Sequence, residues 1–316
     1  MIYIKDLHEG DSIKGIYLCK SKKTCQKPTG KNYYSLTLQD KTGTLDARVW
    51  NLTSGINNFN TMDYIHVKGK VVFFQNALQL HIDQIRVAQE GEYDKEDYVP
   101  LSSQGIEKMY GELTDYIGTV KNKYLRKLAE NVFLEDAEIK KKFVCHSAAK
   151  SVHHSFQGGL LEHTISVVKV CDFMCQNYPI VNRDLVLVAA MFHDIGKIEE
   201  ISCFPENDYT DDGQLLGHIM IGVEMIGFKI REIDGFPHEL ASQLKHCLIA
   251  HHGTLEYGSP KRPATIEALA LSLADQLDAR MQTMKESLEA ADPKLDWIGY
   301  NRFFETNIRK TTNVEE

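Results

Sequence analysis

The sequence predicts two domains, a small β-barrel followed by an all-helical domain. A length of 316 residues suggests two domains at roughly 150 residues each. Over residues 1–88, short segments rich in β-branched and aromatic residues alternate between apolar and polar positions, which is typical of strands. From residue 103 onward apolar residues recur with a period of about 3.6, which predicts helices.

Composition restricts the class of protein. Hydrophobic residues make up 43% of the chain and charged residues 25%, as in ordinary globular proteins. No run approaches the ~18 apolar residues that would span a membrane, and the N-terminus lacks the features of a signal peptide. The seven cysteines are scattered and form no C-x-x-C motif, which favours reduced thiols. We therefore expect a cytoplasmic protein with no membrane segment.

Charge is divided unevenly along the chain, whose net charge is −8. Residues 1–89 hold 12 Lys and Arg against 7 Asp and Glu, a net charge of +5. Residues 90–316 hold the other 24 against 37, a net charge of −13. This asymmetry indicates a polyanion-binding domain joined to an acidic one, and an acidic domain is suited to collecting divalent cations.

Five segments of the first domain have strand character. They are residues 12–20, 32–39, 44–50, 64–75 and 78–87. The turn between the second and third strands is predicted at residues 40–43, where Gly43 can supply a positive φ. Five strands with a loop or short helix between the third and fourth predict a small barrel, most commonly an OB-fold. The pattern over residues 34–50 resembles the second and third strands of nucleic-acid-binding OB domains.

Lysines and aromatic residues occur together in this first domain. The lysines crowd a predicted loop over residues 20–31, and the aromatic residues lie nearby. Cations can follow phosphates, and aromatic rings can stack on the bases of a single strand. The alternative is that the aromatics fill the barrel core and the loop is merely solvated. We favour binding, with contacts from Lys20, Lys22, Tyr33, Tyr34, Arg48, Trp50 and Phe73.

The second domain is predicted to follow an acidic linker over residues 89–102. We expect helices at residues 103–117, 121–134, 136–149, 159–178, 182–193, 217–232, 236–251 and 262–290. The stretch 203–216 is irregular and polar. The domain is expected to end at residue 306, which leaves residues 307–316 as a frayed tail.

A histidine followed directly by an aspartate, His193-Asp194, ends an apolar run over residues 185–192. Gly196 then permits a tight turn, which brings Lys197 beside these two residues. Further metal-ligand residues lie at or near predicted helices: His163, His218, His251, His252 and Asp275.

Each of these residues, taken alone, could be a satisfied core residue or a helix cap. Taken together, they would leave several histidines and aspartates buried without a charge partner, which is costly. A pair of metal ions explains the whole set. Imidazole nitrogen combined with carboxylate oxygen suits Mn, Fe, Co, Ni or Zn better than Ca or Mg, and Mn²⁺ is favoured here.

The ordered series of ligands resembles the HD superfamily of metal-dependent phosphohydrolases over roughly residues 144–290. The closer similarity is to YhaM-type 3′-5′ exoribonucleases, in which an OB domain precedes such a domain. The resemblance implies a first ion on His163, His193, Asp194 and Asp275, and a second on Asp194, His218, His251 and His252. Which of the two adjacent histidines ligates directly stays open. The resemblance also implies a short hairpin within residues 203–216.

Two such ions would activate water and neutralise the charge of a phosphodiester. Asp194 and Lys197 are the expected catalytic residues, with Lys197 contacting a phosphate oxygen or the leaving group. Arg280 is a candidate phosphate contact. The resemblance places His154 at the rim of the pocket.

The favoured function is a 3′-5′ exonuclease that hydrolyses single-stranded RNA, with single-stranded DNA as a further substrate. One alternative is an HD phosphohydrolase acting on small nucleotides, although residues 257–260 depart from the Gly-Tyr-Pro motif of the cyclic-dinucleotide enzymes. Another is a non-catalytic replication or regulatory factor that binds nucleic acid, which the complete ligand set disfavours. A homo-oligomer is compatible with all three functions.

Overall fold

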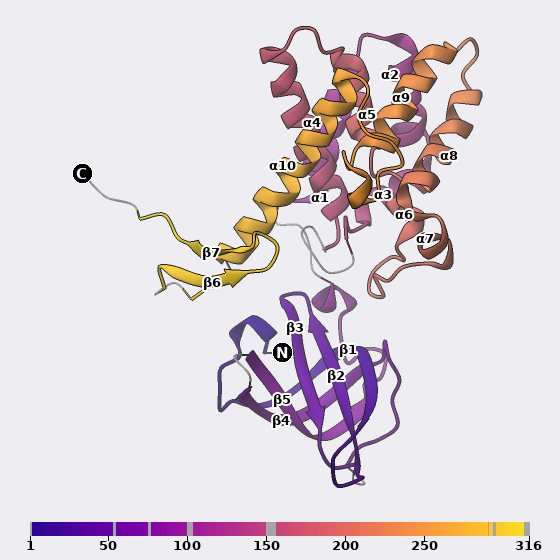
Figure 1. Ribbon diagram of the computed structural model, residues 1–316. Coiled ribbons are helices and arrows are strands. Elements are labelled where there is room, and N and C mark those ends of the chain that lie inside the picture. Colours follow the sequence, from indigo (N-terminus) through magenta and orange to yellow (C-terminus); the bar gives the residue numbers. More distant parts are fainter. Residues whose placement is uncertain are drawn as a thin grey trace. The chain divides into compact units, whose positions relative to one another are not determined.

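The computed structural model describes residues 2–52, 55–74, 77–99, 104–149, 156–289, 291–292 and 295–312. The chain divides into two compact units (Figure 1). One unit comprises Met1–Ser103 with Ser202–Asp208, and the other comprises Gln104–Ile201 with Tyr209–Glu316.

Five strands close the first unit into a barrel with the order β1-β2-β3-β5-β4. The strands are β1 (Ser12–Gln26), β2 (Asn32–Asp40), β3 (Gly43–Val49), β4 (Tyr64–Phe74) and β5 (Ala77–Val87). Strand β1 pairs antiparallel with both β2 and β4, and the parallel pairing of β3 with β5 completes the closure. This is the five-stranded barrel that the sequence predicts.

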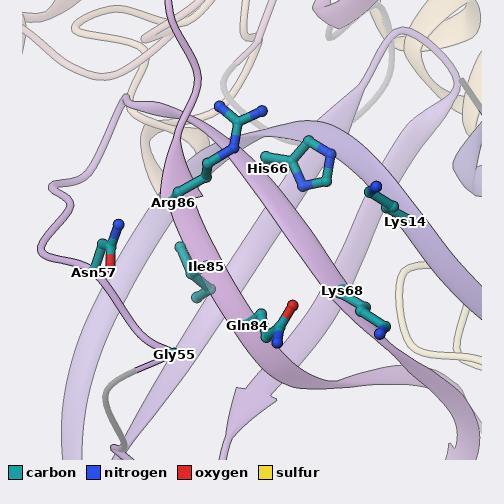
Figure 2. A pocket seen from close by; sticks show the side chains of 8 residues that line it. All are labelled: Lys14, Gly55, Asn57, His66, Lys68, Gln84, Ile85 and Arg86. Carbon is teal, nitrogen blue, oxygen red and sulfur yellow. The ribbon is translucent and has the colours of Figure 1, made fainter.

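Alternation along each strand separates the barrel core from the outer surface. On β4, Ile65, Val67 and Val71 are buried in the core. His66 and Lys68 alternate with them and lie on the outer side (Figure 2). Because side chains of a strand point to opposite faces in turn, the apolar set fixes the register and thereby the outward positions.

Strand β1 is longer than the sequence pattern predicts. The expectation of a loop over residues 20–31 is therefore wrong for residues 20–26. Lys20 and Lys22 lie on the strand, and only residues 27–31 form the turn. Lys27 N donates to Lys31 O at 2.8 Å, and Gly30 adopts a φ of +81°. The end of the strand lacks aliphatic residues, so its pairing with β2 decides its conformation where alternation gives no signal.

Residues 89–99, where a linker is predicted, pack against the barrel. Asp94 caps the short 3₁₀ helix η2 (Lys95–Tyr98) by accepting from Glu96 N. Tyr98 is buried, with its ring 4.9 Å from that of Tyr64. Gln39 Nε2 donates to Tyr98 O at 3.0 Å, which ties this segment to β2.

Helices form almost all of the second unit, and each of the eight predicted helices is present. They are α1 (Ile106–Thr119), α2 (Lys123–Glu130), α3 (Ala137–Cys145), α4 (Gly159–Asn177), α5 (Arg183–Phe192), α8 (Gly217–Arg231), α9 (His238–Ala250) and α10 (Ile266–Glu289). Helix α5 is the centre of the core, because every residue from Leu185 to Phe192 is buried. It packs against α4, α9 and α10, which carry further site residues. The prediction of an OB barrel followed by a helical HD-type domain is confirmed.

Two short α-helices and two short strands of the second unit escaped prediction. They are the helices α6 (Lys197–Glu200) and α7 (Asp211–Leu215) and the strands β6 (Trp297–Asn301) and β7 (Thr306–Arg309). Residues 307–309, expected in the tail, belong to β7. In the described part of residues 201–216, the implied hairpin is reduced to a single bridge between Ile201 and Tyr209. Elements of four or five residues are too short to show a period. No helix among the described residues is long and apolar enough to cross a bilayer.

Candidate metal centre

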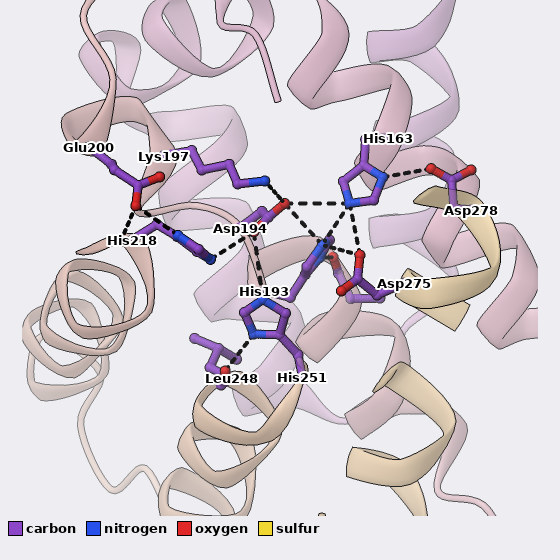
Figure 3. A network of polar contacts seen from close by, with 11 residues as sticks. His163, His193, Asp194, Lys197, Glu200, His218, Leu248, His251, Asp275 and Asp278 are labelled. Carbon is purple, nitrogen blue, oxygen red and sulfur yellow. Dashed lines mark hydrogen bonds and ion pairs between the residues drawn. The ribbon is translucent and has the colours of Figure 1, made fainter. Parts of the chain in front are cut away.

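The predicted histidine and aspartate ligands converge in the helical unit, and Figure 3 labels all of them except His252. They come from helices α4, α8 and α10 and from the residues that directly follow α5 and α9. In that order they are His163, His218, Asp275, the pair His193-Asp194, and the pair His251-His252. Elements separated by more than a hundred residues along the chain thus supply a single candidate site.

One group of donor atoms surrounds His163. Its Nε2 lies 3.1 Å from His193 Nε2 and 3.2 Å from Asp275 Oδ1. Asp194 Oδ2 lies 3.4 Å from His163 Nε2 and 3.3 Å from His193 Nε2. Two imidazole nitrogens and two carboxylate oxygens therefore face a common centre, with the composition that first-row transition metals prefer.

A second group lies on the other side of Asp194. Its Oδ1 is 3.5 Å from His218 Nε2 and 3.7 Å from His251 Nε2. Ligand atoms of His218, His251 and His252 all lie within 4.8 Å of one another. The two oxygens of one carboxylate thus face two separate donor groups, which is the arrangement of a bridging ligand.

The second group fits a cation. Asp194 Oδ1, His218 Nε2 and His251 Nε2 are buried and have no hydrogen-bond partner among the described residues. Leaving a buried polar atom unsatisfied costs about 1–3 kcal/mol. Because all three atoms are electron-pair donors that face one another, a shared cation would satisfy them together.

Main-chain carbonyls set the proton positions of three candidate ligand histidines. His193 Nδ1 donates to Ala190 O at 2.7 Å, and His251 Nδ1 donates to Leu248 O at 2.6 Å. His252 Nδ1 donates likewise to a main-chain carbonyl, at 2.8 Å. A carbonyl oxygen can only accept, so each Nδ1 carries the proton and each Nε2 keeps a lone pair for a metal.

Carboxylates fix the proton on Nδ1 of the other two candidate ligand histidines. His163 Nδ1 donates to Asp278 Oδ2 at 2.6 Å, and His218 Nδ1 donates to Glu200 Oε1 at 3.0 Å. Asp278 and Glu200 were missed in the sequence. The available signal was helical spacing, because Asp278 lies three residues after Asp275 on α10 and therefore on nearly the same face.

We expect Asp278→Ala to weaken metal binding by about 10–100-fold, because His163 loses the partner that orients it and raises its basicity. The affinity for Mn²⁺, measured by competition with a chelator, checks this. Asp234→Ala removes an exposed carboxylate of the same unit and is the control. Equal affinities for the two variants would contradict the role of Asp278.

The two halves of the site differ electrostatically. Burial disfavours a charge on His163, but Asp194, Asp275 and Asp278 outweigh burial and hold its pKa well above the ordinary value. Burial lowers the pKa of His251 well below the ordinary value, and neighbouring histidines lower it further. Burial opposes ionisation of Asp194, yet nearby cations, chiefly Lys197, keep its pKa well below the ordinary value. The Asp194 carboxylate is therefore ionised.

Lys197 reaches into the centre of the site. Its Nζ lies 2.7 Å from Asp194 Oδ2, and its side chain is 16% exposed. Burial lowers the pKa of this ammonium, but Asp194 outweighs burial and raises it. The sequence correctly predicts that Lys197 lies beside Asp194.

Gly196 serves a purpose different from the predicted tight turn. Its φ is −64°, a value open to any residue. A Cβ at this position would lie 2.1 Å from His218 O and 2.7 Å from Gly222 N. Glycine is therefore required because the start of α6 touches the backbone of α8, and this contact brings His218 close to Asp194.

A cleft of about 470 Å³ opens beside the metal ligands. Asp275 and His252 line it, together with the predicted Arg280. Arg302 and Phe303, in the turn between β6 and β7, also line it and were missed because the hairpin was not predicted. Both arginines are exposed, and neither forms an ion pair with a described residue, so both guanidinium groups can meet an anion in the cleft.

The turn that carries Arg302 and Phe303 is anchored to α10. Asn301 Oδ1 accepts from Phe303 N at 2.9 Å, and Asn301 Nδ2 donates to Ser287 Oγ at 3.2 Å. Tyr257, 63% exposed, lines the cleft too. Cations and aromatic rings thus stand next to the metal ligands. His154, predicted at the pocket rim, lies outside the described residues.

Three of the predicted nucleic-acid contacts gather on the barrel. The ring of Tyr33 lies 4.7 Å from that of Trp50, and Lys27 Nζ lies 5.3 Å from the Trp50 ring. His81 meets Trp50 edge to face at 5.8 Å and is the β-pairing partner of Arg48. This aromatic cluster carries cations on its border, as in binders of single strands.

The other predicted contacts lie elsewhere on the barrel. Lys22 Nζ donates to Phe59 O at 2.6 Å and lies 4.5 Å from the Tyr34 ring, so both side chains pack next to the core. Lys20 lies at the bulge between Cys19 and Ser21 on β1. Phe73, near the end of β4, is 54% exposed.

Comparison with known families gives the class of the protein. A family model described as an HD domain matches residues 160–280, and one described as an OB-fold nucleic acid binding domain matches residues 21–88. Fold and site together define an HD-domain protein with an N-terminal OB barrel.

Curated relatives narrow the class. The 3′-5′ exoribonuclease YhaM of Listeria innocua is 32% identical over 91% of this chain and 91% of its own length. That of Listeria monocytogenes is 33% identical over the same shares, and that of a Geobacillus species is 32% identical over 90% of this chain and 87% of its own length. The chain belongs to the YhaM family of exoribonucleases.

Proposed function

We propose that this protein hydrolyses single-stranded RNA from the 3′ end with the help of two divalent metal ions, and that single-stranded DNA is a further substrate. Membership of the YhaM family supports the direction and the polymer. One observation carries the mechanism. The two oxygens of Asp194 face two separate groups of imidazole nitrogens, and Asp194 Oδ1, His218 Nε2 and His251 Nε2 have no hydrogen-bond partner among the described residues.

The first ion would be held by His163, His193, Asp194 and Asp275, and the second by Asp194, His218, His251 and His252. Both adjacent histidines are assigned as ligands, because both hold Nδ1–H on a carbonyl and offer Nε2. Mn²⁺ is favoured, and Co²⁺, Fe²⁺, Ni²⁺ or Zn²⁺ would suit the same donors. When bound, such ions supply Lewis acidity that lowers the pKa of water and offsets the charge of a phosphodiester.

Residues of the chain position the strand. Lys197 stabilises negative charge on the scissile phosphate, since its ammonium is already fixed at the site by Asp194. Arg280 and Arg302 hold phosphate oxygens in the adjoining cleft. Phe303 and Tyr257 offer exposed rings on which the terminal bases stack.

The barrel captures the strand upstream of the cleaved bond. Tyr33 and Trp50 provide the stacking surface, and Arg48 with Lys20 and Phe73 extends it. Lys22 and Tyr34 are assigned a supporting role through Phe59. We place the protein in the cytoplasm, where its seven free cysteines stay reduced.

A labelled-strand assay tests this function. The protein is incubated with 5′-labelled single-stranded RNA and Mn²⁺, with EDTA as the control. The expected result is a ladder that shortens from the 3′ end and is absent with EDTA. Turnover of cyclic dinucleotides without a ladder would instead indicate a small-nucleotide phosphohydrolase. Binding without turnover would indicate a non-catalytic factor.

Phe303→Ala should raise KM for RNA roughly tenfold or more while kcat changes little, because a stacked base contributes about 1–3 kcal/mol. Steady-state kinetics on an oligoribonucleotide provides the measurement. Phe173→Ala removes a comparably exposed ring on α4 that does not line the cleft, and serves as the control. An unchanged KM for Phe303→Ala would remove stacking at this position from the proposal.

A further inference from the structure

A basic hollow lies on the outer face of β1, β4 and β5, and no role has yet been assigned to it. Its volume is about 340 Å³. Figure 2 shows Lys14, His66, Lys68 and Arg86 around it, with Ile85 also in the lining. The aromatic cluster of Tyr33 and Trp50 belongs instead to β2 and to the end of β3.

Two like charges face each other across this hollow, because Lys14 on β1 is directly opposite Lys68 on β4. His66 on β4 is directly opposite Arg86 on β5, whose guanidinium forms an ion pair with Glu92. Directly opposed like charges destabilise a sheet. Lys14 and Lys68 are both exposed, and neither forms an ion pair with a described residue. A bound anion would offset their repulsion.

Backbone hydrogen bonds build one wall of the hollow. Asn57 N donates to Ile85 O at 3.0 Å, and Ile85 N donates to Gly55 O at 2.9 Å. This segment therefore lies along β5 as an added strand-like edge. The side-chain amides of Asn57 and Gln84 line the hollow and add neutral hydrogen-bonding groups to its cations.

The pKa of His66 depends on the charged groups around the hollow. Burial lowers its pKa first, and Arg86 and Lys14 lower it further. Glu92, which forms an ion pair with Arg86 at 2.7 Å, opposes this effect. The pKa of His66 is therefore lowered chiefly by burial and further by neighbouring positive charge, and an anion in the hollow would oppose the second effect and raise this pKa.

We propose that this hollow is a second phosphate-binding site of the barrel, which takes backbone phosphates of a single nucleic-acid strand. The inference extends the strand capture described under the proposed function and rests on it. His66 and Lys68 are two residues apart on the same face of β4, so their positions are about 6.7 Å apart. That step is comparable with the spacing of consecutive phosphates along an extended strand. The mixture of cations and amides suits phosphate with ribose.

The double variant Lys14→Gln/Lys68→Gln in the full-length chain tests the site. Binding of a labelled 20-nucleotide RNA is measured by fluorescence anisotropy in EDTA over a range of salt concentrations. Loss of two phosphate contacts should lower the slope of log K against log[salt] by about 1.4, since each contact to a single strand contributes about 0.7. Affinity at low salt should fall roughly tenfold.

Lys5→Gln/Lys95→Gln is the matched control, because it removes the same charge from two exposed lysines of the same unit that do not line the hollow. An unchanged slope in the Lys14/Lys68 variant, or an equal fall in both double variants, would overturn the proposal. Hydrolysis of a dinucleotide should be unaffected by either variant. Failure of the wild-type protein to cleave any RNA would instead count against the proposed function alone.

The His66 ring, followed by NMR in histidine-labelled protein, gives a second measurement. The RNA should raise the pKa of His66, and it should not do so in the Lys14/Lys68 variant. A rise produced by inorganic phosphate but not by RNA would overturn the assignment to a strand and leave a site for the free ion.

Discussion

Asp194→Asn should lower kcat on single-stranded RNA by at least about 10³-fold, equivalent to roughly 4 kcal/mol. Its two carboxylate oxygens face the two groups of imidazole nitrogens, at 3.3–3.4 Å on one side and 3.5–3.7 Å on the other. An amide is neutral and replaces one of the oxygens with a group that donates. Both ions should therefore bind more weakly, and the loss at one site should extend to the other.

Metal content measured beside kcat checks this prediction. The wild-type protein should carry two ions per chain, and Asp194→Asn fewer than one. Asp212→Asn changes an exposed carboxylate on α7 and should retain both ions and full activity. If Asp194→Asn kept both ions and most of its activity, Asp194 would not be a bridging ligand.

Lys197→Met should lower kcat on the order of 10²-fold, which is the usual cost of removing one group that stabilises transition-state charge. Methionine keeps much of the length and apolar surface of lysine but has no charge. Because the ammonium is not itself a metal ligand, both ions should remain bound. The decrease should appear in kcat rather than in KM, since the interaction strengthens as charge develops on the phosphate.

Metal analysis separates the two roles open to Lys197. Lys197→Arg, which keeps the charge, should recover part of the activity. Loss of both ions in Lys197→Met would show that the lysine acts only by orienting Asp194, against the assignment of a phosphate contact.

The fold was predictable where segments are long enough to show a period. Alternation from Tyr64 to Phe74 and the apolar run from Leu185 to Phe192 placed a barrel strand and the central helix nearly to the residue. The extension of β1 to Gln26 was not predictable, because residues 20–26 gain their conformation from pairing with β2. Helices α6 and α7 and strands β6 and β7 have only four or five residues each, so tertiary packing determines their conformation.

The convergence of the candidate ligands was predictable because metal-binding residue types recur beside helix ends and within apolar stripes. The groups that orient them were harder to find. The role of Glu200 can be seen only in the folded chain, where α6 places its carboxylate beside His218, 18 residues further along the sequence. Arg302 and Phe303 depend on a hairpin whose strands give no signal alone. Side chains that act through contacts between elements distant in sequence therefore could not be predicted from the sequence.

Both halves of the candidate metal centre use the same two kinds of hydrogen-bond partner for the histidine Nδ1 atoms. Each half holds one imidazole on a carboxylate, through Asp278 or Glu200, and at least one on a carbonyl at the end of a helix. Carbonyls of the last helical turn are present whatever the side chains are, so those histidines keep their orientation under substitution of their neighbours. The orientation of His163 and His218 depends instead on the side chains of Asp278 and Glu200, so a substitution at either position would change how a candidate ligand is held without replacing the ligand itself.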